Sequence, residues 1–165
     1  MESFEWNKLS ELGIEVIDRE HREILNMINS LRNTLRSDNH DGAKRVVLSG
    51  VLEEGIAFTR NHFAAEESLM QMSSYPAYLD HKNEHELFLK RLDDLHAQVR
   101  GGVETLTPET LGLLGNWLHH HVLETDKPIV LHLVKAGLSH SAVGSRGKVT
   151  SDISIGPIDL GTIKR

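Results

Sequence analysis

Four segments of the chain carry apolar residues at alternating steps of three and four positions, which is the pattern of helices that bury one face. The stripes run from Ile17 to Leu35, from Leu48 to Leu69, from Tyr78 to Val99 and from Leu111 to Thr125. The connections between them are short, at residues 38–42, 73–76 and 101–107. Short loops join antiparallel neighbours, so the pattern predicts an all-α, antiparallel up-down-up-down four-helix bundle.

Residues that commonly begin or end helices flank these stripes. Asp18 is a candidate N-cap for the first helix, and the second helix is predicted over residues 42–72. The remaining boundaries are marked by Ser74 and Pro76 before the third helix, Gly101 and Gly102 after it, and Thr107 with Pro108 at the start of the fourth.

Two segments lie outside the four stripes. Residues 1–16 contain Phe4, Trp6, Leu9, Leu12 and Ile14, so we expect an arm that packs against the helices. Residues 137–165 are rich in Gly, Ser and β-branched residues, which predicts a non-helical extension. We therefore expect one domain over residues 1–136 and an extended or partly ordered segment over 137–165. This segment could support self-association or contact with a partner chain.

The composition limits which metal ligands and which partners are possible. The chain has no cysteine among 165 residues, so any metal must be held by nitrogen and oxygen ligands, and 11 residues are histidine. The net charge is −6 and no basic cluster occurs, which argues against a nucleic-acid partner. No apolar run is long enough to cross a membrane, and the acidic start is unlike a signal peptide. We expect a cytoplasmic protein without membrane insertion.

Six titratable residues fall on positions that the periodicity assigns to the core, namely His21, His62, Glu66, His81, His85 and His121. A buried carboxylate or imidazole is costly unless it has partners. In an antiparallel bundle all six lie within roughly 5–20 Å of the same end, given a rise of 1.5 Å per residue. Such clustering is what a metal centre between facing helices requires.

The spacing within helices supports this interpretation. His62 and Glu66 are four residues apart, as are His81 and His85, so each pair projects from one face. Asp126 lies five residues after His121, about 140° around a regular helix. We therefore predict a π-type widening or kink between them, favoured by Pro128.

Other histidines fit this centre less well. Successive helix residues point about 100° apart, so of the three consecutive histidines only His121 can face inward, and His119 and His120 are expected at the periphery. The remaining four are expected at the surface or as hydrogen-bond partners of ligands, and these are His40, His96, His132 and His140.

These residues resemble the motifs of the hemerythrin family, specifically its single-domain bacterial members. The similar segments are Trp6 with residues 13–21, HFAAEESLM from His62 to Met70, Tyr75 and Pro76 before HKNEH from His81 to His85, and WLHHHV from Trp117 to Val122 followed by Asp126. The resemblance covers residues 4–134, and its one departure in the last motif is Val122 in place of isoleucine.

The resemblance implies a non-haem, oxo- or hydroxo-bridged di-iron centre that binds dioxygen reversibly, for storage, transport or delivery. It assigns one iron to His81, His85 and His121, the other iron to His21 and His62, and the bridging positions to Glu66 and Asp126. With a bridging oxygen these ligands fill eleven of about twelve coordination positions, which leaves one for dioxygen on the two-histidine iron. By the same analogy, a dry wall around the dioxygen is expected from Phe63, Trp117, Leu118 and Val122.

Three alternatives remain. His81 to His85 also matches the HxxEH motif of zinc peptidases, although no further ligand with a substrate cleft accompanies it. A ferritin-like di-iron oxidase would need Glu-x-x-His pairs, and none of the histidines has glutamate three residues before it. We therefore expect oxygen binding and not enzymatic activity, with weak oxidase or peroxidase turnover as the enzymatic alternative. An oxygen or redox sensor acting through a partner is the third.

Overall fold

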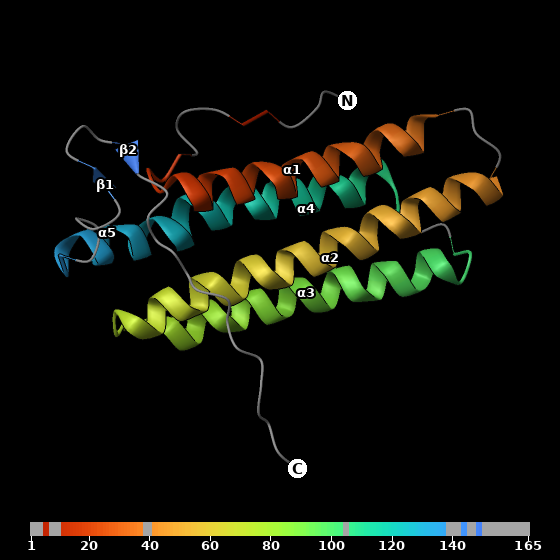
Figure 1. Ribbon diagram of the computed structural model, residues 1–165. Helices are drawn as coiled ribbons and strands as arrows, with labels where there is room; N and C mark the ends of the chain where they lie inside the picture. The colour runs from red at the N-terminus through yellow and green to blue at the C-terminus, as the bar shows by residue number, and fades with distance from the viewer. Residues whose placement is uncertain are drawn as a thin grey trace, which may run out of the picture.

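The computed structural model describes residues 5–6, 11–37, 41–103 and 106–137, and the backbone of 143–144 and 148–149. Its helices are α1 (Glu15–Arg36), α2 (Asp41–Met72), α3 (Tyr78–Arg100), α4 (Pro108–His120), the π-helix η2 (His121–Asp126) and α5 (Lys127–Lys135). α4, η2 and α5 follow one another without a break and form the fourth rod of the bundle (Figure 1). The predicted four-helix bundle is confirmed.

Neighbouring helices run in opposite directions, as their short connections require. α1 packs against α2 and α4, and α2 packs against α3. The starts of α1 and α3 therefore lie at the same end of the bundle as the finish of α2 and as η2 and α5 (Figure 1). Every candidate metal ligand of the sequence comes from a helix segment near this end.

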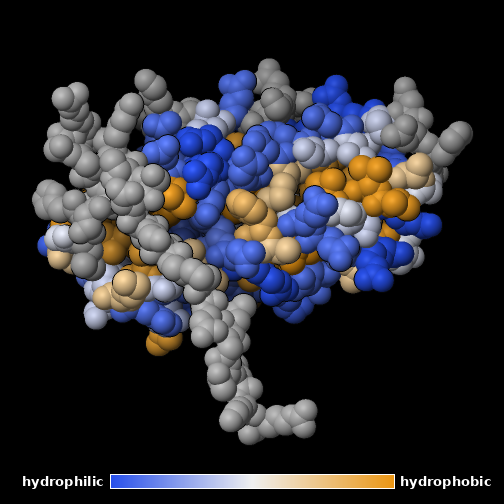
Figure 2. All heavy atoms as spheres, in the orientation of Figure 1, coloured by the Kyte–Doolittle hydropathy of each residue, from blue (hydrophilic) through white to orange (hydrophobic). Residues whose placement is uncertain are grey.

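The interior consists of two apolar clusters with a polar layer between them. The large cluster extends along most of the bundle and includes Ile24, Leu52, Phe63, Phe88 and Leu118. The small cluster, at the α5 end, consists of Met70, Ile129 and Leu133 with Ile14, Tyr75 and Tyr78 packed against it. The outer face drawn in Figure 2 is mostly hydrophilic. Burial of the two clusters therefore fixes the height and orientation of whatever side chains lie between them.

The first residues of two helices can be compared with the N-caps that the sequence predicted. Thr107 is the N-cap of α4, where its hydroxyl accepts a hydrogen bond from the Thr110 backbone N–H, and Pro108 follows in the first turn as predicted. Asp18 is not the N-cap of α1, because the helix begins three residues earlier at Glu15. Its buried carboxylate instead accepts hydrogen bonds from the backbone N–H groups of Leu12 and Gly13, at 2.7 and 2.9 Å. Asp18 thus ties the N-terminal arm to α1.

The segments outside the bundle are described only in part. Trp6 and Leu12 of the arm pack against the large apolar cluster, which agrees with the expectation of a packed arm. Beyond α5, β1 (Val143–Gly144) and β2 (Lys148–Val149) pair in antiparallel fashion. The other expectations for residues 138–165 lie outside the described residues, and the domain boundary at 136 stays a prediction. No helix in the described ranges is long and apolar enough to span a membrane.

Candidate metal centre

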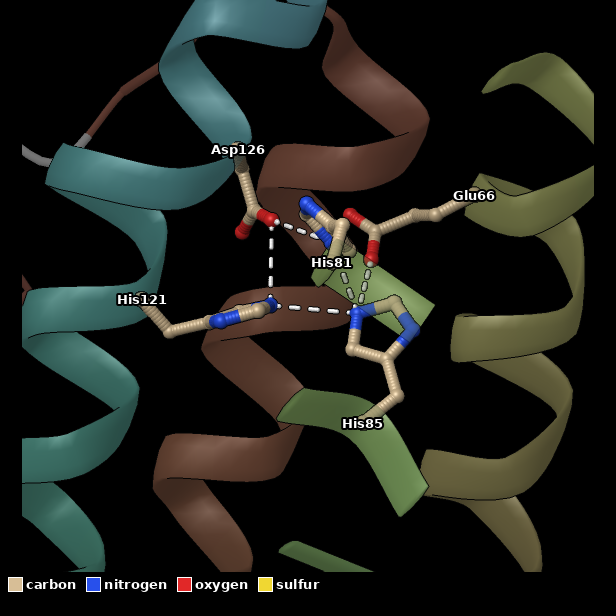
Figure 3. A group of neighbouring side chains, drawn as sticks. All are labelled: Glu66, His81, His85, His121 and Asp126. Carbon is tan, nitrogen blue, oxygen red and sulfur yellow. Dashed lines mark hydrogen bonds and ion pairs between the residues drawn. The ribbon is translucent and has the colours of Figure 1, made fainter. Parts of the chain in front are cut away.

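The structure brings all seven candidate ligands together in the polar layer between the two apolar clusters. They come from every rod of the bundle: His21 from α1, His62 and Glu66 from α2, His81 and His85 from α3, and His121 and Asp126 from η2. Each residue is at most 2% exposed. Figure 3 shows five of them pointing toward one another, and candidate ligand atoms of these five lie within 4.8 Å of one another. His21, His62 and Glu66 form a second group by the same measure.

The π-helix η2 is what places Asp126 in this layer. It spans His121 to Asp126, where the sequence predicted a widened turn, so that prediction is confirmed. In a regular helix a residue five positions after His121 would point about 140° away from it. In η2 both side chains are buried, and the Asp126 carboxylate approaches the His121 Nε2 to 3.1 Å. A single widened turn thus supplies two inward-facing candidate ligands.

Three imidazoles form a compact set that we call the three-histidine group: His81, His85 and His121. The Nε2 of His85 lies 2.9 Å from that of His81 and 3.1 Å from that of His121. Adjacent nitrogen ligands at right angles around one metal, with bonds of about 2.0–2.1 Å, would lie about 2.9 Å apart. Lone pairs that converge so closely repel each other unless a cation lies between them. The spacing therefore fits a shared metal ion.

His21 and His62 form a second set on the opposite side of the carboxylates, which we call the two-histidine group. Their rings lie 4.7 Å apart, edge to face. Each Nε2 approaches the Glu66 Oε1, at 3.6 Å from His21 and 3.5 Å from His62. This group has one imidazole fewer than its neighbour, so an ion held here would keep more positions for other ligands.

Glu66 and Asp126 lie between the two groups, and each turns one oxygen toward each group. The Glu66 Oε2 lies 3.4 Å from the His85 Nε2, while its Oε1 faces His21 and His62. The Asp126 Oδ1 lies 3.3 Å from the His81 Nε2, while its Oδ2 lies 3.2 Å from the His21 Nε2. Carboxylates arranged in this way are suited to bridge two metal ions.

Three further glutamates contact the outer nitrogens of the imidazoles, and the sequence analysis did not identify them. The Nδ1–H of His62 donates to Glu20 at 2.9 Å, that of His85 to Glu67 at 3.2 Å, and that of His121 to Glu84 at 3.2 Å. A carboxylate on Nδ1 fixes the tautomer whose Nε2 lone pair points inward, which is the usual arrangement around protein-bound metals. Each glutamate is next in sequence to a candidate ligand but braces a histidine of another helix.

The electrostatics of the layer favour a cation. Burial would raise the pKa of both carboxyls, yet the neighbouring imidazoles hold the pKa of Glu66 well below its usual range and lower that of Asp126. Burial and the neighbouring His85 lower the pKa of His81 to about 4, so its imidazole is neutral at pH 7. Burial alone would lower the pKa of His21, but the nearby carboxylates of Asp126 and Glu66, 3.2 and 3.6 Å from its Nε2, raise it to about 9. The layer therefore contains ionised carboxylates that attract positive charge.

Several polar atoms of the layer have no hydrogen-bond partner among the residues that the structure describes. They are buried, and they include the Nε2 atoms of His21 and His62, the Glu66 Oε2 and both Asp126 oxygens. A buried polar atom without a partner costs about 1–3 kcal/mol. A donor set of imidazole and carboxylate suits divalent iron and related metals, so ions bound here would satisfy these atoms.

Of the four residues expected around dioxygen, two lie against the three-histidine group. Phe63 stacks on His85 with ring centroids 3.7 Å apart, and Trp117 stacks on His121 at 4.4 Å. Leu118 and Val122 are also buried, at 2% and 0% exposure. The role of all four toward dioxygen stays a prediction.

The other histidines that the structure describes are not among the ligand atoms of the layer. His119 and His120 are exposed, as expected. His96 shares a hydrogen bond with Ser49 at 3.0 Å, and His132 donates to the Ser73 carbonyl at 2.8 Å. His40 and His140 lie outside the described residues.

Comparisons with known proteins agree with this geometry. Residues 12–130 match the family model described as the hemerythrin HHE cation binding domain. The chain is 31% identical over 147 residues to a bacteriohemerythrin of Stenotrophomonas maltophilia, covering 87% of this chain and 92% of that protein. It is 36% identical over 121 residues to a bacteriohemerythrin of Pseudomonas aeruginosa, covering 73% of this chain and 75% of the relative. A wild-type hemerythrin crystal structure superposes with a TM-score of 0.70 at 25% identity, covering 79% of this chain and 97% of the other.

Proposed function

The chain belongs to the hemerythrin family, and from this premise we propose that it binds dioxygen reversibly at a non-haem di-iron centre. The three-histidine group would hold one iron and the two-histidine group the other, with Glu66 and Asp126 shared between them. The iron pair supplies the redox chemistry on which dioxygen binding depends. The protein contributes the positions of the ligands and the exclusion of water.

The observation that carries the proposal is the position of the two carboxylates. Each of Glu66 and Asp126 has one oxygen toward each histidine group, at 3.1–3.6 Å from the nearest Nε2 atoms. A site for a single ion has no use for this arrangement, because half of the carboxylate oxygens would face away from it. The layout supports a pair of ions.

Binding is favoured over catalysis because the layer has no acid or base left for a substrate. In the described part of the bundle, Glu20, Glu67 and Glu84 are hydrogen-bonded to imidazoles, and the buried carboxylate of Asp18 is bonded to the backbone. General acid–base catalysis needs such a group within reach of the substrate. A cytoplasmic location stays a prediction of the sequence. Weak oxidase or peroxidase turnover and sensing through a partner stay its alternatives.

An optical spectrum of the purified protein tests the proposal. The iron-loaded protein is reduced without oxygen, then aerated, then returned to low oxygen. Reversible binding is expected to give a visible band that rises and falls with oxygen over several cycles. Irreversible bleaching, or no band at full iron content, would contradict it. The variant His120→Ala is the control, because this side chain is exposed and lies outside the layer.

A further inference from the structure

A pocket of about 250 Å³ lies between the N-terminal arm and α4. Its apolar walls are formed by Trp6 of the arm, Leu25 of α1, and Gly115 with Leu118 of α4. The exposed residues Glu5 and His119 also line it. Leu118 lies three residues, about one helical turn, before His121, so this end of the pocket is next to the metal layer.

Trp6 is the residue that links the pocket to the two-histidine group. Its ring lines the pocket and also lies 5.9 Å from the ring of His21, tilted by 35°. The Arg22 guanidinium lies 6.0 Å from the centre of the same indole ring. The buried indole N–H has no hydrogen-bond partner within the described ranges. One side chain of the arm thus contacts both the pocket and the imidazole next to it.

A pocket of about 350 Å³ also lies on the braced side of the three-histidine group, lined by Glu84, Phe88 and Trp117, but stacked rings separate it from the imidazoles. Phe63 and Trp117 stack on His85 and His121, and Phe88 stacks on Trp117 with centroids 3.8 Å apart. Closely packed rings of this kind leave no room for a ligand unless they move. The pocket beside Trp6 instead adjoins the group that has fewer imidazoles.

We propose that this pocket is the entry site for a small neutral gas molecule, and that Trp6 controls its passage to the two-histidine group. The inference rests on the proposed function and names the route to the same centre. The apolar part of the lining suits an uncharged diatomic molecule, whereas an anion would lose hydration against it. The carboxylate of Glu5 at the pocket adds repulsion against anions.

The arm is held in position by contacts that do not involve the metal ligands. Asp18 accepts the backbone N–H groups of Leu12 and Gly13, and Glu11 lies 3.8 Å from Arg22. Arg22 in turn lies over the Trp6 ring. These contacts hold the described residues of the arm against α1, with the indole beside His21.

The test compares Trp6→Ala with Leu12→Ala in the iron-loaded protein. Both variants remove an apolar contact of the arm with the core, but only Trp6 lines the pocket. The rate of dioxygen binding, measured by flow mixing, is expected to rise about tenfold in Trp6→Ala, within the range that single variants produce. Leu12→Ala is expected to bind at the wild-type rate. Trp6→Phe keeps an aromatic ring, and its rate of dioxygen binding is expected to lie between those of the two alanine variants. It keeps the test valid if Trp6→Ala does not fold.

Xenon bound in crystals under pressure gives a readout that does not depend on oxygen chemistry, because xenon occupies apolar cavities. Xenon is expected between Trp6 and Leu118. Equal rates in the two alanine variants, or xenon absent from this pocket, would overturn the inference. In either case the reversible band of the wild-type protein would still support the proposed function. If the wild-type protein shows no such band, both proposals fail together.

Discussion

The two histidine groups use the same kinds of ligand but are surrounded differently. In the three-histidine group, His85 and His121 each have a glutamate on Nδ1 and an aromatic ring stacked on the imidazole. In the two-histidine group only His62 has such a glutamate, and the Nδ1 of His21 has no partner among the described residues. The ring nearest to His21 in the arm belongs to Trp6, which also lines a pocket.

This difference indicates that the two histidine groups have different roles within one layer. Imidazoles that are fixed in tautomer and orientation hold a metal tightly and keep its coordination constant. The less braced group, with one ligand fewer and an adjoining pocket, is where an external molecule can bind. The following predictions test this contrast, from the largest expected effect to the smallest.

Removing one imidazole from each group gives the most direct test. His85→Ala is expected to abolish binding of both ions, because it removes the ligand closest to both other imidazoles of its group and leaves Glu66 facing an empty position. His62→Ala is expected to keep one ion, held by the three-histidine group. Metal analysis after dialysis measures the difference. Equal loss of metal from both variants would show that the two histidine groups do not differ in metal affinity.

Removal of the metal by a chelator should lower the free energy of unfolding, because the buried polar atoms of the layer lose their bound ions. Ions that bind only the folded chain stabilise it by about 3–4 kcal/mol when present at 100–1,000 times their dissociation constant. The metal-free protein is therefore expected to unfold at lower temperature and at lower denaturant concentration. Re-addition of ferrous iron without oxygen should restore the original midpoint. An unchanged midpoint would mean that the layer is stable by itself.

Substitution of the glutamates that accept hydrogen bonds from imidazole Nδ1 atoms tests how much these contacts strengthen metal binding. Glu84→Gln is expected to weaken metal binding by about 10–100-fold, the usual effect of losing such a contact. Its effect should exceed that of Glu20→Gln, because Glu84 also accepts a hydrogen bond from the Thr125 hydroxyl within η2. Competition with a metal-binding dye measures both affinities. Glu124→Gln, an exposed residue of η2, is the matched control and should bind metal as the wild type does.

The tether of the arm should have the smallest effect on stability. Asp18→Asn keeps the size of the side chain but can accept only one of the two backbone hydrogen bonds well. It is expected to cost about 1 kcal/mol of unfolding free energy. Metal content and the rate of dioxygen binding should both stay the same, as expected for Leu12→Ala, because Trp6 is unchanged. A loss of iron in this variant would mean that the arm supports the ligands and not only the entry pocket.

The parts of the molecule that depend on periodicity could be predicted from the sequence. Apolar spacing located the four rods and six of the seven inward-facing side chains, and the angle between His121 and Asp126 indicated the π-helix that turns the seventh inward. Asp18 was misassigned because the same side chain that can cap a helix can also accept bonds from the chain before it. Which of the two roles Asp18 has depends on where the N-terminal arm lies, and residue spacing does not encode that position.

The bracing glutamates could not be assigned because their partners lie on other helices. Glu20 adjoins His21 in sequence but contacts His62, and Glu67 adjoins Glu66 but contacts His85. Their positions at the margin of the buried face look like ordinary solvated charge. A carboxylate next to a ligand, at a helix–helix seam, is the signal that could have identified them.

The shared carboxylates also have a consequence for how the protein acquires iron. An ion in one group fixes the rotamers of Glu66 and Asp126, so the second ion meets oxygens that are already aimed at it. Uptake is therefore expected to be positively cooperative, because the two ions are coupled through the same ligands. At limiting iron, a preparation would contain mostly empty and fully loaded molecules, with few in between.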